Sequence, residues 1–304
     1  MIVINGLTKT FDDVIALENF NMTVKKGSIY GLIGTNGAGK TTLLKLLSGV
    51  LKADSGTIRI DDEVVYENPA IKERLSFIPD DLQFFAVYTL NEISKYFARI
   101  YDKWNDALFD EIIAEFHLDK KKKLSRFSKG MQKQAVFAVS LATSPDFLIL
   151  DEPIDGLDPL VRKTVWSYII SASAERQMTT LISSHNLREM EGICDAVGII
   201  DKGEMILEKE LDELRGDIHK LQLSFEGAPA TDSQLESIYR HLHVVHRDKR
   251  GAVDIFIVRN NRETLDEWKN LYHPILFDPI PLTLEEVFIY ELGGTNHAIN
   301  SIIS

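Results

Sequence analysis

The segment Gly34-Thr35-Asn36-Gly37-Ala38-Gly39-Lys40-Thr41 decides the fold class of this chain. Its spacing of Gly, four residues and Gly-Lys-Thr matches a phosphate-binding loop, whose Gly-rich backbone turns successive N–H groups toward phosphate oxygens. In that pattern Lys40 reaches the β- and γ-phosphates and the Thr41 hydroxyl binds Mg²⁺. A buried strand predicted over 28–33 and an amphipathic helix predicted over 41–50 flank the loop, which favours this interpretation over a Gly-rich turn without a ligand.

Composition sets limits on the class of protein. The chain has 304 residues, with 34 Lys and Arg against 46 Asp and Glu and a formal charge of −12. This length suffices for one large domain and a smaller one. The negative charge argues against non-specific nucleic-acid binding, which depends on neutralising phosphates. Cys194 is the sole cysteine, so no intrachain disulfide can form, and its apolar neighbours predict a small buried side chain.

The sequence contains no apolar run approaching the roughly 18 residues that span a bilayer. Its first residues lead directly into a strand-like run, without a charged and then apolar signal segment. These features predict a cytoplasmic protein that reaches the inner face of the membrane only through a partner. We interpret Lys120–Lys123 as a solvated turn, because four lysines without a nearby anchor bind lipid headgroups weakly.

Strand and helix patterns alternate along the first two thirds of the chain, which predicts a parallel core sheet flanked by helices. Residues 89–143 are predicted to be mostly helical, beginning at a capping box formed by Thr89 and Glu92. Lys25-Lys26-Gly27 is predicted to be a tight hairpin turn. The other predicted strands are 2–4, 20–24, 57–60, 76–79, 147–150, 179–183 and 196–200, and the other predicted helices are 160–174 and 187–193.

A seam near Arg215-Gly216-Asp217 divides the chain into predicted domains 1–215 and 216–304. Beyond it the pattern predicts a small α+β appendage. Thr283–Glu286 is a second capping box and opens a short helix that ends at Gly293. The appendage also has predicted strands 220–225, 244–247 and 253–258 and predicted helices 233–242 and 263–272.

A second chemical site is predicted at Phe147–Pro153 (FLILDEP). Four apolar residues form a buried strand, and acids at its carboxyl end lie at the edge of the sheet where the phosphate loop also lies. Asp151 is expected to hold Mg²⁺ through water, and Glu152 to orient or deprotonate the attacking water. Two carboxylates at a strand end can also be plain surface charge, but their pairing with a good phosphate loop favours the catalytic interpretation.

With these two sites, the chain over about residues 2–215 resembles the nucleotide-binding subunit of an ATP-binding cassette (ABC) transporter. Phe127–Gln132 (FSKGMQ) is similar to the family signature LSGGQ and keeps Ser128 and Gly130. A Ser at a helix N-terminus offers its hydroxyl, free N–H groups and the positive end of the helix dipole to a γ-phosphate. A plain helix cap is the alternative for Ser128. The resemblance implies the α/β ABC ATPase fold: a parallel core sheet, an antiparallel β edge and a helical subdomain at about 82–143.

The same resemblance assigns further residues one by one. Gly156-Leu157-Asp158 resembles a loop that crosses to a partner subunit. His185 resembles the switch histidine that contacts the γ-phosphate, and Phe11 resembles the aromatic residue that stacks on adenine. Asp80 stands where the family usually has a Gln in Mg²⁺ coordination, with Asp81 as a possible substitute. Catalysis is assigned to Glu152 and His185, and Mg²⁺ binding to Thr41, Asp80 and Asp151. ATP binding is assigned to the phosphate loop, the signature and two single residues: Phe11, Gly34, Thr35, Asn36, Gly37, Ala38, Gly39, Lys40, Thr41, Thr42, Ser128, Lys129, Gly130, Met131 and Asp158.

The implied activity is hydrolysis of ATP by a head-to-tail pair of ATPase subunits, identical or paralogous, that drives a separate transmembrane permease. The end of the appendage, Leu284–Phe288 (LEEVF), resembles the extension of bacterial exporters of the drug-, antibiotic- or bacteriocin-resistance type. The alternatives are a soluble ABC ATPase acting on ribosomes or DNA, and a nucleotide-binding regulator without turnover. A single cassette without heptad repeats disfavours the first, and an intact Glu152 and His185 disfavour the second.

Overall fold

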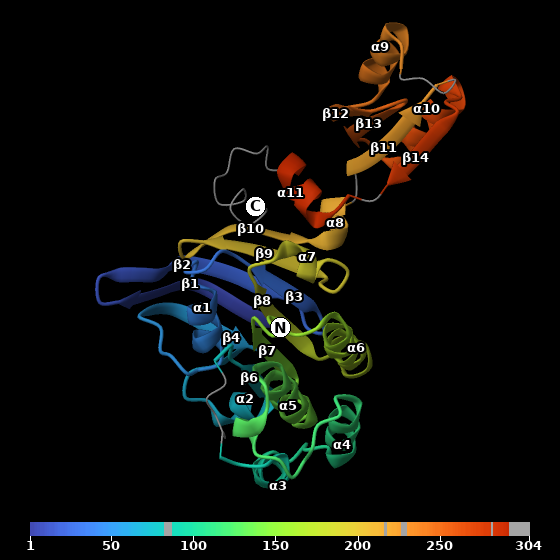
Figure 1. Ribbon diagram of the computed structural model, residues 1–304. Helices are drawn as coiled ribbons and strands as arrows, with labels where there is room; N and C mark the ends of the chain where they lie inside the picture. Colours follow the sequence, from blue (N-terminus) through green and yellow to red (C-terminus); the bar gives the residue numbers. More distant parts are fainter. Residues whose placement is uncertain (82–86, 216–217, 226–229, 281, 292–304) are drawn as a thin grey trace. The chain divides into compact units, whose positions relative to one another are not determined.

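The computed structural model describes residues 1–81, 87–215, 218–225, 230–280 and 282–291 (Figure 1). They form two compact units. The first unit comprises Met1–Asn186 and Gly192–Glu208, and the second comprises Leu187–Glu191 and Lys209–Ser304. The main boundary therefore lies a few residues before the seam seen in the sequence, and a short internal segment of the cassette belongs with the second unit.

A six-stranded sheet in the order β10-β9-β3-β8-β7-β6 forms the centre of the first unit. Its neighbours from β9 to β6 pair in parallel, which confirms the predicted parallel core. Every residue of β3 and β7 is buried, as expected where helices cover both faces of a parallel sheet. The strands are β3 (Ile29–Ile33), β6 (Leu75–Ile78), β7 (Phe147–Asp151), β8 (Thr179–Ser184), β9 (Ala196–Asp201) and β10 (Glu204–Glu210).

A second sheet of the first unit, in the order β2-β1-β4-β5, is antiparallel and matches the predicted β edge. Its strands are β1 (Ile2–Phe11), β2 (Val14–Val24), β4 (Ser55–Ile60) and β5 (Glu63–Val64). The predicted hairpin at Lys25–Gly27 is wrong, because β2 and β3 lie in different sheets. The turn itself forms, with Ser28 N–H donating to the Lys25 carbonyl at 3.3 Å. Turn residues mark a change of chain direction but do not show whether the flanking strands pair.

Helix α1 (Lys40–Leu47) lies between the two sheets of the first unit. Its Leu43 and Leu47 share one hydrophobic core with Ile4 of β1 and Ile149 of β7. Because this helix is packed on both sides, the loop that precedes it has a fixed position.

Cys194 is buried, as predicted from its apolar neighbours, and burial raises the pKa of its thiol.

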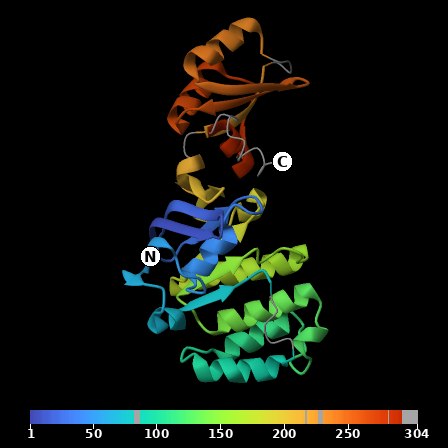
Figure 2. The same ribbon diagram turned by 90° about the vertical axis from the view of Figure 1, so that its left-hand side faces the viewer.

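The segment predicted to be helical contains three α-helices that pack on one another as a group (Figure 2). The Thr89–Glu92 capping box is present at the start of the first of them. Residues 82–86 of the predicted helical subdomain lie outside the described residues. The remaining helices of this unit are α2 (Pro69–Arg74), α3 (Leu90–Ile100), α4 (Asp106–Glu115), the 3-10 helix η1 (Leu124–Arg126), α5 (Lys129–Ala142) and α6 (Pro159–Arg176).

The second unit contains an antiparallel sheet in the order β12-β13-β11-β14. With its chain order βαββαβ, this is the split-βαβ, ferredoxin-like arrangement. One strand of this sheet, β14, was not predicted from the sequence; it is short and contains Pro279. The elements are α7 (Leu187–Met190), α8 (Leu211–Arg215), β11 (Ile218–Ser224), α9 (Asp232–His241), β12 (Val244–Arg250), β13 (Val253–Arg259), α10 (Arg262–Tyr272), β14 (Leu276–Ile280) and α11 (Leu284–Glu291).

The second unit has a hydrophobic core of its own. Leu221 and Phe256 from the sheet pack with Leu265 and Trp268 from α10, and none of these residues belongs to the core of the first unit. Each unit therefore buries apolar surface independently, which is the physical requirement for a separate domain.

Substitution of Phe256 by Ala is expected to unfold the second unit at lower temperature while leaving nucleotide binding intact. Phe256 is fully buried, and truncating a buried Phe costs about 3–5 kcal/mol. Calorimetry should show one transition shifted downward and a second unchanged. Val245→Ala, at an exposed site in β12, is the control and should move neither. A single transition that shifts as a whole would show that the two cores unfold together.

Candidate functional site

The phosphate-binding loop leaves the carboxyl end of β3 and enters α1. Gly37 and Gly39 have φ of +83° and +109°, a backbone region that favours glycine. A Cβ on Gly39 would lie 2.7 Å from the Ala16 carbonyl oxygen, so no larger residue fits there without a backbone shift. No side chain caps α1, whose first N–H groups are therefore suited to an anion.

The Lys40 ammonium lies inside this loop. Only 6% of its side chain is exposed, and Nζ donates to the carbonyl oxygens of Gly34 at 2.7 Å and Thr35 at 3.2 Å. Nζ also lies 3.3 Å from Oε1 of Glu152, an ion-pair distance without hydrogen-bond alignment. The predicted phosphate-binding cation and the predicted catalytic acid are thus direct neighbours.

Asp151 stands at the carboxyl end of β7 and is almost fully buried. Its Oδ2 accepts a hydrogen bond from Thr41 Oγ1 at 2.8 Å, and its Oδ1 accepts one from Ser183 Oγ at 2.7 Å. Carboxylate and hydroxyl oxygens are the ligands that Mg²⁺ prefers, and Mg²⁺ sites usually combine one or two carboxylates with substrate phosphates. The side chains of Thr41 and Asp151 therefore fit the predicted metal.

Glu152 is held from several directions. Its backbone N–H donates to Ser183 Oγ at 3.0 Å, and its Oε2 lies 3.0 Å from His185 Nδ1. Its Oε1 is buried and accepts no hydrogen bond from the described residues. An oriented carboxylate with one oxygen still able to accept a proton is what a general base for water requires.

Two residues at this site were missed by the sequence analysis. Ser183 links Asp151 to the Glu152 backbone, and Lys133 donates at 2.9 Å both to Asp80 Oδ1 and to the Glu152 carbonyl. The signal for Ser183 was its place at the carboxyl end of a buried strand beside β7. Lys133 offered a weaker signal, since it is one of several lysines near the signature.

Asp80 pairs with Lys133, and it is Asp151 that is hydrogen-bonded to Thr41. The structure thus connects Asp80 to the backbone of Glu152 through a lysine. Its predicted role as a metal ligand remains a proposal.

The other predicted residues lie on separate elements. Ser128 caps α5 by accepting from Met131 N–H at 3.2 Å, and Asp158 caps α6 by accepting from Leu160 N–H at 3.1 Å. Phe11 ends β1 with 42% of its surface exposed, and Lys9 Nζ lies 5.2 Å from its ring centre. Lys40, Thr41, Asp151, Glu152 and His185, in contrast, form one connected cluster, in which Ser183 links Asp151 to Glu152.

A phosphate-binding loop whose Lys and Thr meet two acids at the end of a nearby parallel strand defines a P-loop nucleoside triphosphatase. The sequence model of the family described as "ABC transporter" matches residues 17–155. The chain is 31% identical to the ABC transporter ATP-binding protein YtrB of Bacillus subtilis (strain 168), over 97% of this chain and 99% of the relative. It is 37% identical to the bacitracin transport ATP-binding protein BcrA of Bacillus licheniformis, over 95% of this chain and 96% of that protein.

Among solved structures, the ATP-binding subunit of an ABC transporter aligns with a TM-score of 0.65 and 26% identity, covering 71% of this chain and 92% of that one. This chain belongs to the ABC transporter family, as an ATP-binding and ATP-hydrolysing subunit. The predicted transport ATPase is thereby confirmed over the alternatives of a ribosome- or DNA-directed ATPase and a regulator without turnover.

Ser183→Ala is expected to lower the hydrolysis rate by about tenfold to a hundredfold. It removes the hydroxyl that joins Asp151 to the Glu152 backbone, and hydrogen bonds to charged groups contribute roughly 1.5–3 kcal/mol. Steady-state kinetics should show the loss mainly in kcat. Thr180→Val is the matched control, because the buried Thr180 hydroxyl on the same strand has no hydrogen-bond partner among the described residues. Equal losses in both variants would contradict a specific role for Ser183.

Proposed function

We propose that this chain hydrolyses ATP·Mg²⁺ within a pair of ATPase subunits and thereby drives export of an antibiotic-like compound through a separate permease. The observation that carries the proposal is the placement of Glu152. It is fixed between Lys40 of the phosphate loop and His185 at the end of β8, with Oε1 able to accept a proton.

In this proposal Lys40 and the N–H groups at the start of α1 bind the β- and γ-phosphates. Thr41 and Asp151 hold the Mg²⁺, which neutralises charge that develops on the transferred phosphoryl group. Glu152 orients the attacking water and accepts its proton, and His185 keeps the Glu152 carboxylate in place and reaches the γ-phosphate. Phe11 offers an exposed aromatic face on which adenine can stack.

A head-to-tail pair of subunits accounts for the residues that lie apart in the single chain. The N-terminus of α5 offers the Ser128 hydroxyl and the N–H groups of Lys129 and Gly130 to a γ-phosphate bound by the other subunit. The loop that ends at Asp158 is proposed to cross the same interface. Two such contacts, related by a twofold axis, complete two equivalent ATP sites.

The permease is proposed to bind the surface around α3. A cavity of about 420 Å³ there is lined by Tyr88, Glu92, Ile93, Lys95, Tyr96 and Arg99. Val87, Tyr96 and Ile100 are exposed next to it, and a cluster of exposed apolar side chains marks a contact surface. Phe84 and Phe85, two further apolar residues of the sequence before α3, lie outside the described residues.

Membrane association is assigned to the permease. In the part of the chain that the structure describes, no helix is both long enough and apolar enough to cross a bilayer.

The transported compound is proposed from the relatives: one protein similar over nearly its whole length is named for bacitracin transport. Cells that express this chain with its permease should tolerate more bacitracin than cells that express the Glu152→Gln variant.

Glu152→Gln is expected to keep ATP binding but to lose turnover by about a hundredfold or more, because an amide has the shape of the carboxylate but cannot take a proton. With ATP and Mg²⁺, size-exclusion chromatography should shift the variant toward the mass of a dimer. Lys40→Ala should instead weaken ATP binding itself, measured by fluorescence titration. Near-normal hydrolysis by Glu152→Gln would refute the base role of Glu152.

Joint substitution of Tyr88 and Tyr96 by Ser is expected to abolish co-purification with the permease while ATP binding by the isolated subunit stays within about twofold of wild type. The double variant removes the largest exposed apolar side chains of the proposed docking surface. Leu271→Ser, at an exposed apolar site of the second unit, is the control. Co-purification of the double variant at wild-type yield would place the docking surface elsewhere.

A further inference from the structure

A short segment that begins two residues after His185 belongs to the second unit. Leu187–Glu191 groups with that unit, although Asn186 before it and Gly192 after it belong to the first. Leu187 is only two positions beyond the histidine that contacts Glu152. Asn186 alone therefore separates the segment from His185.

Polar contacts within the second unit hold this segment on α11. The Arg188 guanidinium makes a bidentate contact with Glu285, with Nε at 2.8 Å from Oε1 and Nη2 at 2.9 Å from Oε2. Leu284 N–H donates to Glu191 Oε1 at 3.3 Å. Planar, two-point Arg–carboxylate contacts fix orientation as well as distance. The segment and the first turn of α11 are thus joined at both ends of the segment.

Helix α11 is in turn anchored to the sheet of the second unit. Glu286, next to Glu285, pairs with Lys220 of β11 at 2.6 Å and closes a capping box with Thr283. Lys220 alternates with Leu221, whose side chain is in the helix-covered core, so Lys220 lies on the opposite face of the sheet. Two adjacent glutamates therefore connect the sheet to the segment after His185.

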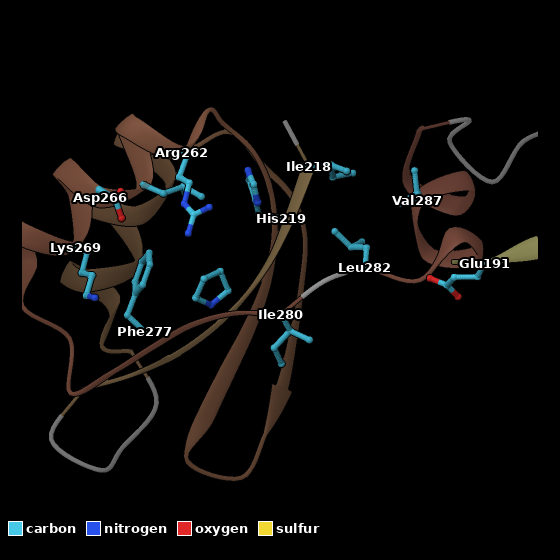
Figure 3. A pocket seen from close by; sticks show the side chains of 12 residues that line it. Glu191, Ile218, His219, Arg262, Asp266, Lys269, Phe277, Ile280, Leu282 and Val287 are labelled. Atoms are coloured by element: carbon cyan, nitrogen blue, oxygen red, sulfur yellow. The ribbon is translucent and has the colours of Figure 1, made fainter. Parts of the chain in front are cut away.

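The segment also borders a pocket of the second unit. This pocket has a volume of about 490 Å³ (Figure 3). One end is lined by Glu191, Leu282 and Val287, and the other end by Arg262 and Phe277.

We infer that the second unit sets the rate of hydrolysis by positioning His185, with Arg188 and Glu285 as the positioning residues that transmit the effect. The inference rests on the proposed function, in which His185 holds Glu152 at 3.0 Å. Movement of α11 displaces Arg188, the backbone carries the displacement to His185, and the orientation of the Glu152 carboxylate changes. Neither Arg188 nor Glu285 touches the nucleotide in this account, so their effect falls on kcat.

The test is a charge exchange in the full-length chain. Arg188→Glu and Glu285→Arg should each lower kcat for ATP by about fivefold or more, the lower end of typical couplings between sites, with KM for ATP changed less than twofold. The Arg188→Glu/Glu285→Arg double variant should regain most of the wild-type kcat. In a His185→Ala background the single variants should have no further effect, because the group they position is gone.

A matched control is available in the same unit. Arg250 pairs with Asp248, and its side chain is 74% exposed against 73% for Arg188, so Arg250→Glu removes a comparable surface ion pair and should leave kcat unchanged. Wild-type kcat in both charge reversals, or no recovery in the double variant, would overturn the inference. If a reversal does not fold, Arg188→Lys and Glu285→Gln replace it: each should lower kcat without changing KM for ATP and should have no further effect in the His185→Ala background, and wild-type kcat in both would overturn the inference. The proposed function is tested separately. If the wild type hydrolyses ATP and the Glu152→Gln variant does not, the proposed function stands even when the charge reversals overturn the inference.

Discussion

The buried carboxylate of Asp151 constrains the rest of the nucleotide site. A buried charge is costly unless each oxygen has a hydrogen-bond partner. Thr41 supplies one partner from the start of α1, and Ser183 supplies the other from β8. Satisfying this one group therefore fixes the position of the phosphate loop relative to two neighbouring strands. The same geometry places two hard oxygen ligands beside the loop, so the structural requirement and the proposed metal site coincide.

Glu152, the next residue, adopts a backbone conformation that is unfavourable for a side chain of its kind, with φ of 47°. Residues held in this region cost of order 1–3 kcal/mol and persist only where their surroundings fix them. The surroundings here are specific: Ser183 accepts from its N–H, Lys133 donates to its carbonyl, and Lys40 and His185 face its carboxylate. The strain turns the carboxylate back toward the phosphate loop, which a regular continuation of β7 would not do.

The sequence was sufficient for the loop, the acidic pair and the order of most strands, because each carries a local signal in spacing or periodicity. The sequence did not predict features that depend on contacts between segments far apart in the chain. Ser183 and Lys133 gain their roles only when β8 and α5 lie beside β7, and the local signals at these residues do not identify the partners they contact. The wrong hairpin at Lys25–Gly27 has the same cause, since partner choice in a sheet depends on the whole fold. The grouping of Leu187–Glu191 with the second unit follows from its contacts with α11, nearly a hundred positions away in the sequence.

Ser183 in β8 and His185 directly after it contact the two acids in different ways. Ser183 is fully buried and belongs to the rigid network around Asp151, whereas two residues later His185 is nearly half exposed and holds Glu152 through a single contact. The proposed phosphate and metal site thus contacts a buried residue of β8, whereas the proposed base is contacted by His185, the first residue after the strand. The chain leaves the first unit directly after Asn186, so the contact to the proposed base is made two residues before the segment that groups with the second unit.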